Sequence, residues 1–391
     1  MGKGFFQAAL VIICFLGLLF PPFVQAKDLI VGVGTALSGA AAPSGLGLLR
    51  ATELAAEDVN SSGGIKVGKD VYQIKLVVYD HKYDVKEALT VANKLVYSDK
   101  AKYIVTFGAT CVVAVNPLIT ENKVLHIASS YGGKKATHPG APYTFRACME
   151  PAQSHPMLLP WIAKKYGLKT IALTSTDDET GLIQAEDAEK EAKNIGLTIT
   201  DKAFAPRGTA DFTPMLTKLI AKNPQAIDFG SWAGSEGPLI CKQVKELGYK
   251  GLLIFSYSQS ISVFQKVAGE YMDGILFYSI FATDPTPLAT KVTKRYQEKY
   301  KERIDPIVLR NYDYLLLIRK AIDAAGTLDT TAVRNFMSKV KVEGVFGEAR
   351  IGGKSYYGID CQFLAPNPLA TYDGKQKKFV ELHRGTMPAD Y

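Results

Sequence analysis

Short apolar segments alternate with amphipathic segments over most of the chain. Residues 29–33 are Leu, Ile, Val and one Gly, which predicts a buried strand, and apolar residues at helical spacing over 46–59 predict the helix that follows. The alternation continues as far as residue 128. Further strands are predicted at 72–79, 103–107 and 124–128, and further helices at 85–97 and 112–121.

The same alternation begins again after Pro142. Strands are predicted at 143–147, 170–174, 197–204, 226–231, 252–255 and 274–281, and helices at 157–166, 181–194, 212–222, 238–247 and up to 268. Repeated strand–helix units with mostly apolar strands predict a parallel sheet that helices cover on both faces. Two such runs, near 27–147 and 148–278, therefore predict an α/β fold with two doubly wound parallel-sheet lobes. The helical stretch 286–338 is expected to cover one of them.

The composition agrees with a globular protein of two or three domains. The chain has 391 residues, of which 47% are hydrophobic and 21% charged. These fractions exclude a disordered, collagen-like or coiled-coil chain. The net charge is +8, but the basic residues are scattered without a run of five, so the sequence lacks the clustered basic patch typical of nucleic-acid binding.

Residues 1–26 have the features of a signal peptide. Lys3 gives a positive start, residues 8–20 are apolar apart from one Gly, and residues 24–26 have the small-residue form that signal peptidase accepts. The apolar core is too short for a membrane span, which needs roughly 20 residues. We expect cleavage after Ala26 and export. A lipid anchor at Cys14 is disfavoured because Ile13, rather than a small residue, precedes it.

Four cysteines remain after this cleavage, namely Cys111, Cys148, Cys241 and Cys361. An even number in an exported chain permits two disulfides, in any of three pairings. Ordinary buried thiols are an equally good interpretation. The sequence leaves both open.

Motifs of catalysis and of cofactor binding are absent from the sequence. Residues 45–50 begin like a dinucleotide fingerprint but end in Arg50 where a glycine is needed, and a phosphate loop ending at 353–355 would need glycine at Glu348. The five histidines lie far apart without metal-ligand spacing. No nucleophile–base pair can be named. We therefore expect neither an enzyme nor a metal or cofactor.

Four segments, spread in order over the chain, carry a resemblance to a known family. They are residues 37–64, 91–96, 211–227 and 311–314. Together they resemble the branched-chain amino-acid family of periplasmic binding proteins, which have the type I fold. The first resembles the family's opening loop and first helix, and the third its most diagnostic internal segment.

The resemblance implies a two-lobed periplasmic receptor, expected to be a monomer, that closes around one small ligand and delivers it to an inner-membrane ABC permease. Three strands should cross between the lobes, near 143–150, 276–283 and 355–362. Lobe 1 is then expected at 27–147 plus 279–355, and lobe 2 at 148–278 plus 356–391. A sensory module of the same fold, which reports to a membrane partner, is the alternative.

Two turns of the first lobe are the expected carboxylate site. Ala109 and Thr110 open the helix after strand 103–107 and match the family's carboxylate-binding turn. Backbone N–H groups at a helix start suit an anion because the helix dipole is positive there. Ser129, Ser130 and Tyr131 match the second binding loop, and their hydroxyl and N–H groups also suit an anion.

The second lobe is expected to contribute Asp178, Trp232 and Tyr257. Tyr257 stands where amino-acid binders of this family typically place an acid that holds the ligand ammonium. A buried ammonium needs an opposing charge. Either Asp177 or Asp178 supplies it, or the ligand lacks an ammonium. The ligand class that follows is a small carboxylate, either an amino acid or an aromatic or aliphatic acid; Tyr131, Trp232 and Tyr257 could line a pocket for an aromatic ring.

Overall fold

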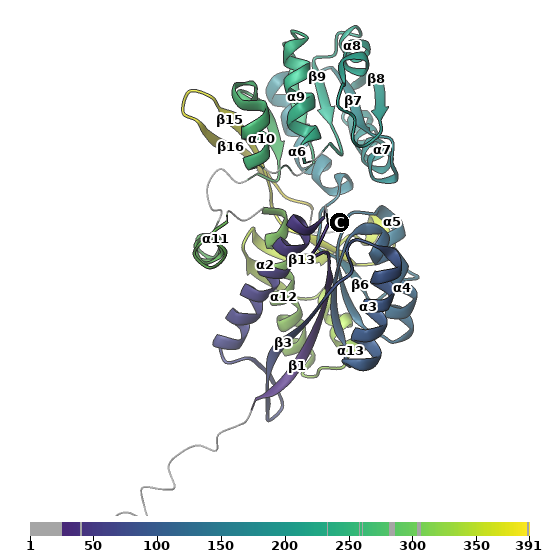
Figure 1. Cartoon of the computed structure of the whole chain (residues 1–391), viewed down its shortest axis with the longest axis vertical. Helices are drawn as coiled ribbons and strands as arrows, with labels where there is room; N and C mark the ends of the chain where they lie inside the picture. Colours follow the sequence, from purple (N-terminus) through teal and green to yellow (C-terminus); the bar gives the residue numbers. More distant parts are fainter. Residues whose placement is uncertain are drawn as a thin grey trace, which may run out of the picture.

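The computed structural model describes residues 26–39, 41–232, 234–257, 259, 261–280, 286–302, 306–388 and 391. The predicted signal segment 1–25 lies outside these residues. Figure 1 shows two lobes stacked along the long axis, with the C-terminus between them. Within the described residues, no helix is long and apolar enough to cross a membrane.

The first lobe is built on a sheet to which nine strands of the described chain contribute, in the order β12-β13-β14-β6-β5-β4-β1-β3-β2. Its central strands β3, β1, β4, β5 and β6 run parallel, as predicted. The strands are β1 (Lys27–Thr35), β2 (Ile65–Val67), β3 (Asp70–Asp80), β4 (Tyr103–Phe107), β5 (Leu125–Ser129), β6 (Thr144–Arg146), β12 (Lys341–Gly344), β13 (Gly347–Gly352) and β14 (Gln362–Leu364).

Helices cover both faces of this sheet. One face packs on α2, α11, α12 and α13, and the other on α3 and α4, so that apolar strand residues are buried on both sides. The helices are α2 (Ala42–Ser61), α3 (Val85–Asn93), α4 (Ala109–Glu121), α5 (Gly133–Ala136), α11 (Pro287–Tyr300), α12 (Pro306–Ala325), α13 (Thr330–Met337) and α14 (Lys354–Tyr357). The prediction that the 286–338 helices cover one lobe is confirmed.

The second lobe has a sheet of order β16-β15-β11-β10-β9-β7-β8. Strands β8, β7, β9, β10 and β11 run parallel, and a C-terminal hairpin adds β15 and β16 antiparallel. The strands are β7 (Thr170–Thr176), β8 (Thr198–Ala205), β9 (Ala226–Phe229), β10 (Leu252–Phe255), β11 (Leu276–Tyr278), β15 (Asn367–Asp373) and β16 (Lys378–Gly385).

The helices of the second lobe also form two layers. Helices α6 and α7 lie on one face, while α8, α9 and α10 lie on the other, each over its own buried cluster. Their bounds are α6 (Pro151–Tyr166), α7 (Glu179–Asn194), α8 (Thr213–Ile220), α9 (Glu236–Glu246) and α10 (Ile261–Ala268), followed by the 3-10 turn η3 (Gly269–Met272).

Three passages of the chain connect the two sheets: from β6 to α6, from β11 to α11, and from β14 to β15. The first two lie where the sequence predicts them. The third differs, because β14 pairs with β6 and β13 in the first sheet, so the chain changes sheet at 365–366 and not at 355–362. The expected assignment of 356–391 to the second lobe thus places β14 in the wrong sheet. The sequence does not show where the chain passes to the second sheet, because residues 361–370 form an almost continuous apolar run.

The structure supports buried thiols rather than disulfides for the four cysteines. Cys111, Cys148, Cys241 and Cys361 are all free and buried. Burial raises the pKa of Cys148 and of Cys361 to about 11, and that of Cys241 to about 12, so these thiols stay protonated and unreactive at neutral pH.

Asp313 on α12 predicts a pH-dependent stability. Its side chain is fully buried and accepts a hydrogen bond from the Val345 N–H at 2.6 Å. Burial raises its pKa from 3.8 to about 7. The folded carboxyl therefore keeps its proton to a higher pH than the unfolded one. Its contribution to stability is complete below about pH 4 and is lost as the pH rises through 7.

Asp313→Asn is expected to remove this dependence because an amide does not titrate. The difference in unfolding midpoint, wild type minus variant, should fall as the pH rises from about 4 to about 7. Thermal unfolding followed by circular dichroism measures it. A difference that stays constant or rises over this range would contradict the prediction.

Candidate functional site

The carboxyl ends of the parallel strands in the two lobes face each other. Tyr131 follows β5 of the first lobe and Tyr257 follows β10 of the second, and their ring centroids lie 4.8 Å apart. Ligands of open α/β sheets bind outside the carboxyl ends of the strands. The space around this tyrosine pair is therefore the candidate ligand site.

Strand β4 delivers Ala109 and Thr110 to this side of the first lobe. Gly108, with a φ of 94°, makes the sharp turn into α4 and, as the N-cap residue, has no side chain to cap this helix. Thr110 is exposed and Ala109 half-buried. The first amides of α4 and the Thr110 hydroxyl are thus placed as an anion site requires.

Ser129 ends strand β5, Ser130 follows it, and both are buried. The Ser130 hydroxyl has no hydrogen-bond partner among the described residues. Buried hydroxyls are rarely left unpaired, which makes Ser130 a candidate to bond a ligand. The half-buried Tyr131 follows directly, so the expected second loop lies in the interlobe region.

The N–H groups just beyond this loop already hold an anion. Gly132 and Gly133 donate to one carboxylate oxygen of Glu150, at 2.8 and 2.7 Å. The other oxygen pairs with Arg146 and accepts a hydrogen bond from the Tyr357 hydroxyl at 2.9 Å. These two amides are occupied by Glu150, so the hydroxyl groups and the start of α4 remain as candidates to bind an anion.

Asp178 lies at the site but is already engaged. It caps α7, accepting from Gly181 N–H at 2.9 Å and from the Thr176 hydroxyl at 2.7 Å. Its second oxygen pairs with Arg207. Burial alone would raise the pKa of Asp178, but these contacts lower it. Its charge is therefore balanced by Arg207, a residue that the sequence analysis missed.

Trp232 comes shortly after β9 of the second lobe. Its side chain is fully buried in the second-lobe core, edge to face with Phe212 at 5.0 Å between ring centroids. The indole N–H donates to the Thr174 hydroxyl at 3.3 Å. The indole thus points into the core, so the expectation that Trp232 contacts the ligand stays unsupported by the geometry.

Tyr83 is a further aromatic residue of the site. It follows β3, is 41% exposed, and its ring lies 5.6 Å from that of Phe107. Burial raises the pKa of its hydroxyl, and the charges of Arg207 and Asp178 across the gap also act on that pKa. Nothing in the segment 80–84 distinguishes this tyrosine from an ordinary turn residue in the sequence.

Contacts at one side of the site hold the lobes together. Lys135 of α5 pairs with Glu179 of α7, and Gly133 packs against Ile183. The Tyr356 hydroxyl donates to Asp187 at 2.8 Å. With the tyrosine pair, these contacts describe lobes that touch around the candidate site.

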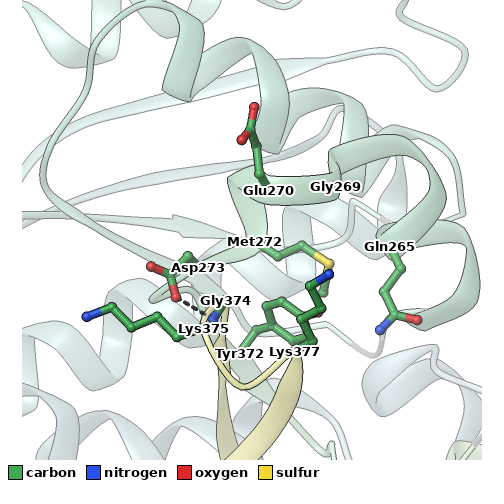
Figure 2. Close-up of a pocket in the computed structure, with 9 residues that line it drawn as sticks. All are labelled: Gln265, Gly269, Glu270, Met272, Asp273, Tyr372, Gly374, Lys375 and Lys377. Atoms are coloured by element: carbon green, nitrogen blue, oxygen red, sulfur yellow. Dashed lines mark hydrogen bonds between the residues drawn. The ribbon is translucent and has the colours of Figure 1, made fainter.

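A separate surface pocket of about 450 Å³ lies on the second lobe, between η3 and the β15–β16 hairpin (Figure 2). Asp273 in its wall accepts the Gly374 N–H at 2.7 Å and so fixes the hairpin turn. The pocket includes none of the expected site residues. The described residues also contain no group of three side chains suited to hold a metal ion.

This architecture, two doubly wound lobes joined by three passages and touching at their strand ends, defines a two-lobed ligand-binding protein. A family model described as periplasmic binding protein matches residues 29–365. The chain belongs to this family, whose members are solute-binding proteins and not enzymes.

Individual relatives agree with this assignment. The chain is 25% identical over 330 residues to the Leu/Ile/Val-binding protein homolog 3 of Brucella melitensis, which covers 84% of this chain and 87% of that protein. Its fold matches an amino acid ABC transporter substrate-binding protein from Pseudomonas fluorescens, with a TM-score of 0.79, 18% identity, and coverage of 93% and 97%. A solute-binding protein from R. palustris in complex with benzoate gives a TM-score of 0.74 at 19% identity, with coverage of 93% and 98%.

Proposed function

We propose that this protein binds a small carboxylate between its lobes in the periplasm and delivers it to an ABC permease. The observation that carries the proposal is the Tyr131–Tyr257 ring contact between the lobes, next to the uncapped start of α4. The carboxylate binds the α4 amides with the hydroxyls of Thr110 and Ser130. The lobes open and close as rigid bodies, and the ligand stabilises the closed state because it contacts both lobes only there.

The side chains around the site favour an aromatic acid over an α-amino acid. Tyr83, Tyr131 and Tyr257 supply aromatic surface, which suits a planar ring. An amino acid would also require a partner for its ammonium. The Asp178 carboxylate already bonds Arg207 and caps α7, and Asp177 is exposed rather than buried against a ligand. Relatives of both kinds support the general class: one is named for leucine, isoleucine and valine, and one was solved with benzoate.

Calorimetric titration with benzoate, L-phenylalanine and L-leucine tests this function. Benzoate is expected to bind most tightly. Tighter binding of either amino acid would reverse the preference but keep the carboxylate site. The absence of heat from all three, for a chain first unfolded and refolded to remove bound ligand, would count against the proposal.

Thr110→Val is expected to weaken benzoate binding by about 10- to 100-fold, the usual cost of losing a hydrogen bond to a charged group. The substitution keeps the shape of the side chain and removes only the hydroxyl. Thr90→Val on α3 is the matched control, because Thr90 is exposed and its hydroxyl bonds only the Lys86 carbonyl at 3.0 Å. Equal affinities of the two variants would remove Thr110 from the site.

A further inference from the structure

The turn after β3 holds two consecutive residues in a conformation that side-chain-bearing residues rarely adopt. Lys82 and Tyr83 have φ values of 55° and 61°, in the left-handed region. Such residues persist only where the surroundings fix them, and they gather at ligand sites and switches. The conformation of this turn therefore suggests a role besides the connection of β3 to α3.

Hydrogen bonds fix the turn from both sides. One oxygen of Asp80 accepts the N–H groups of Lys82 and Leu37, at 2.8 and 2.9 Å, and the other accepts the Ser38 hydroxyl at 2.6 Å. The buried His81 ring accepts the Tyr83 N–H at 3.0 Å. These hydrogen bonds offset the free-energy cost of the two positive φ values. They hold the backbone of Tyr83, and with it the base of its side chain, in one position.

That position is directly over the start of α4. A Cβ built on Gly108 would lie 2.5 Å from the Tyr83 ring, so the ring rests on this glycine. The backbone N–H of Ala109 lies near the Tyr83 hydroxyl and lowers its pKa, against the larger raising effect of burial. Tyr83 remains 41% exposed, and the charges of Arg207 and Asp178 act on the pKa of its hydroxyl.

We propose that Tyr83 is a ligand-binding residue: its hydroxyl, which lies near the Ala109 N–H, donates a hydrogen bond to a carboxylate bound at the start of α4, and its ring shields that contact from water. The inference rests on the proposed function and adds a residue to it. The ring packs on Gly108, the residue directly before the α4 amides, so we expect a carboxylate at those amides to contact it. A hydrogen bond inside a shielded site is stronger than one in water, which gives the ring its role.

Titration of the Tyr83→Phe, Tyr83→Ala and Tyr83→Gly variants with benzoate and L-leucine tests this. For whichever acid the wild type binds, Tyr83→Phe should weaken binding about tenfold, as expected for a hydrogen bond to a charged group. Tyr83→Ala and Tyr83→Gly should weaken it further. The unfolding midpoint of Tyr83→Gly should equal or exceed that of the wild type, because glycine adopts a positive φ without strain.

Tyr166→Ala is the matched control, since Tyr166 is 42% exposed and lies at the far end of α6. It should leave the affinity unchanged. The assignment is overturned if the three Tyr83 variants bind with wild-type affinity. This holds also if their unfolding midpoint falls, since Tyr83 is then a structural residue. A wild-type chain that binds neither acid instead overturns the proposed function, and the assignment of Tyr83 falls with it.

Discussion

Replacing Glu150 by alanine is expected to lower the free energy of unfolding by about 3–5 kcal/mol, the usual cost of removing one partner of a buried ion pair. The side chains of Glu150 and Arg146 are 2% and 0% exposed. Without Glu150, the guanidinium of Arg146 is left in the interior without its carboxylate. The variant also frees the amides of Gly132 and Gly133, which the carboxylate holds.

Denaturant unfolding of wild type and variant measures this loss. Glu179→Ala is the control, because Glu179 pairs with Lys135 on the surface, where ion pairs contribute about 0–1 kcal/mol. A double variant, Arg146→Met with Glu150→Leu, should recover part of the loss, since it removes both charges together. A loss for Glu150→Ala no larger than that of the control would show that Arg146 finds another partner.

Glu150 also ties the binding loop to the connection between the lobes. It stands at the N-cap of α6, after the first passage, and holds the chain that follows Tyr131. Tyr357 of α14 donates to the same carboxylate. One buried group therefore joins the first passage and α14 to the loop that follows β5.

The strand–helix order could be predicted because each central strand is an apolar run that needs cover on both faces. Strands at 103–107 and 226–229 illustrate this: both are largely or wholly buried, as their composition requires. The third passage could not be predicted, because β14 and β15 are both apolar and separated only by Ala365 and Pro366. Which sheet accepts a short apolar strand depends on neighbours distant in sequence.

The positions of two expected site residues in the fold could be predicted. Thr110 and Ser130 follow parallel strands, and the carboxyl ends of such strands meet at one edge. The residues that bond to the site residues and their neighbours could not be predicted. Gly132 and Glu150 are 18 residues apart and Asp178 and Arg207 are 29 apart, and neither spacing follows from a helix or strand period. Tyr83 was missed because the sequence does not display a positive φ.

The direction in which the Trp232 side chain points also could not be predicted from the sequence. Its contacts in the structure lead to a prediction opposite to the one that the sequence suggests. A tryptophan just after a strand can point to the ligand or into the core, and only its contacts decide. Trp232→Ala is expected to cost about 3–5 kcal/mol in unfolding free energy, as for other buried tryptophans. It removes the packing on Phe212 and leaves the Thr174 hydroxyl without its donor.

Denaturant unfolding with Trp161→Ala as control distinguishes the two roles of Trp232. Trp161 is the other tryptophan of the chain, only partly buried and stacked on His383, so its removal should cost less. The affinity of folded Trp232→Ala for benzoate should stay within about threefold of wild type, because the indole faces the core and a change below 1 kcal/mol is expected away from a contact. A large loss of affinity at unchanged stability would instead place the indole against the ligand, because a side chain that serves only the core cannot weaken binding without first weakening the fold.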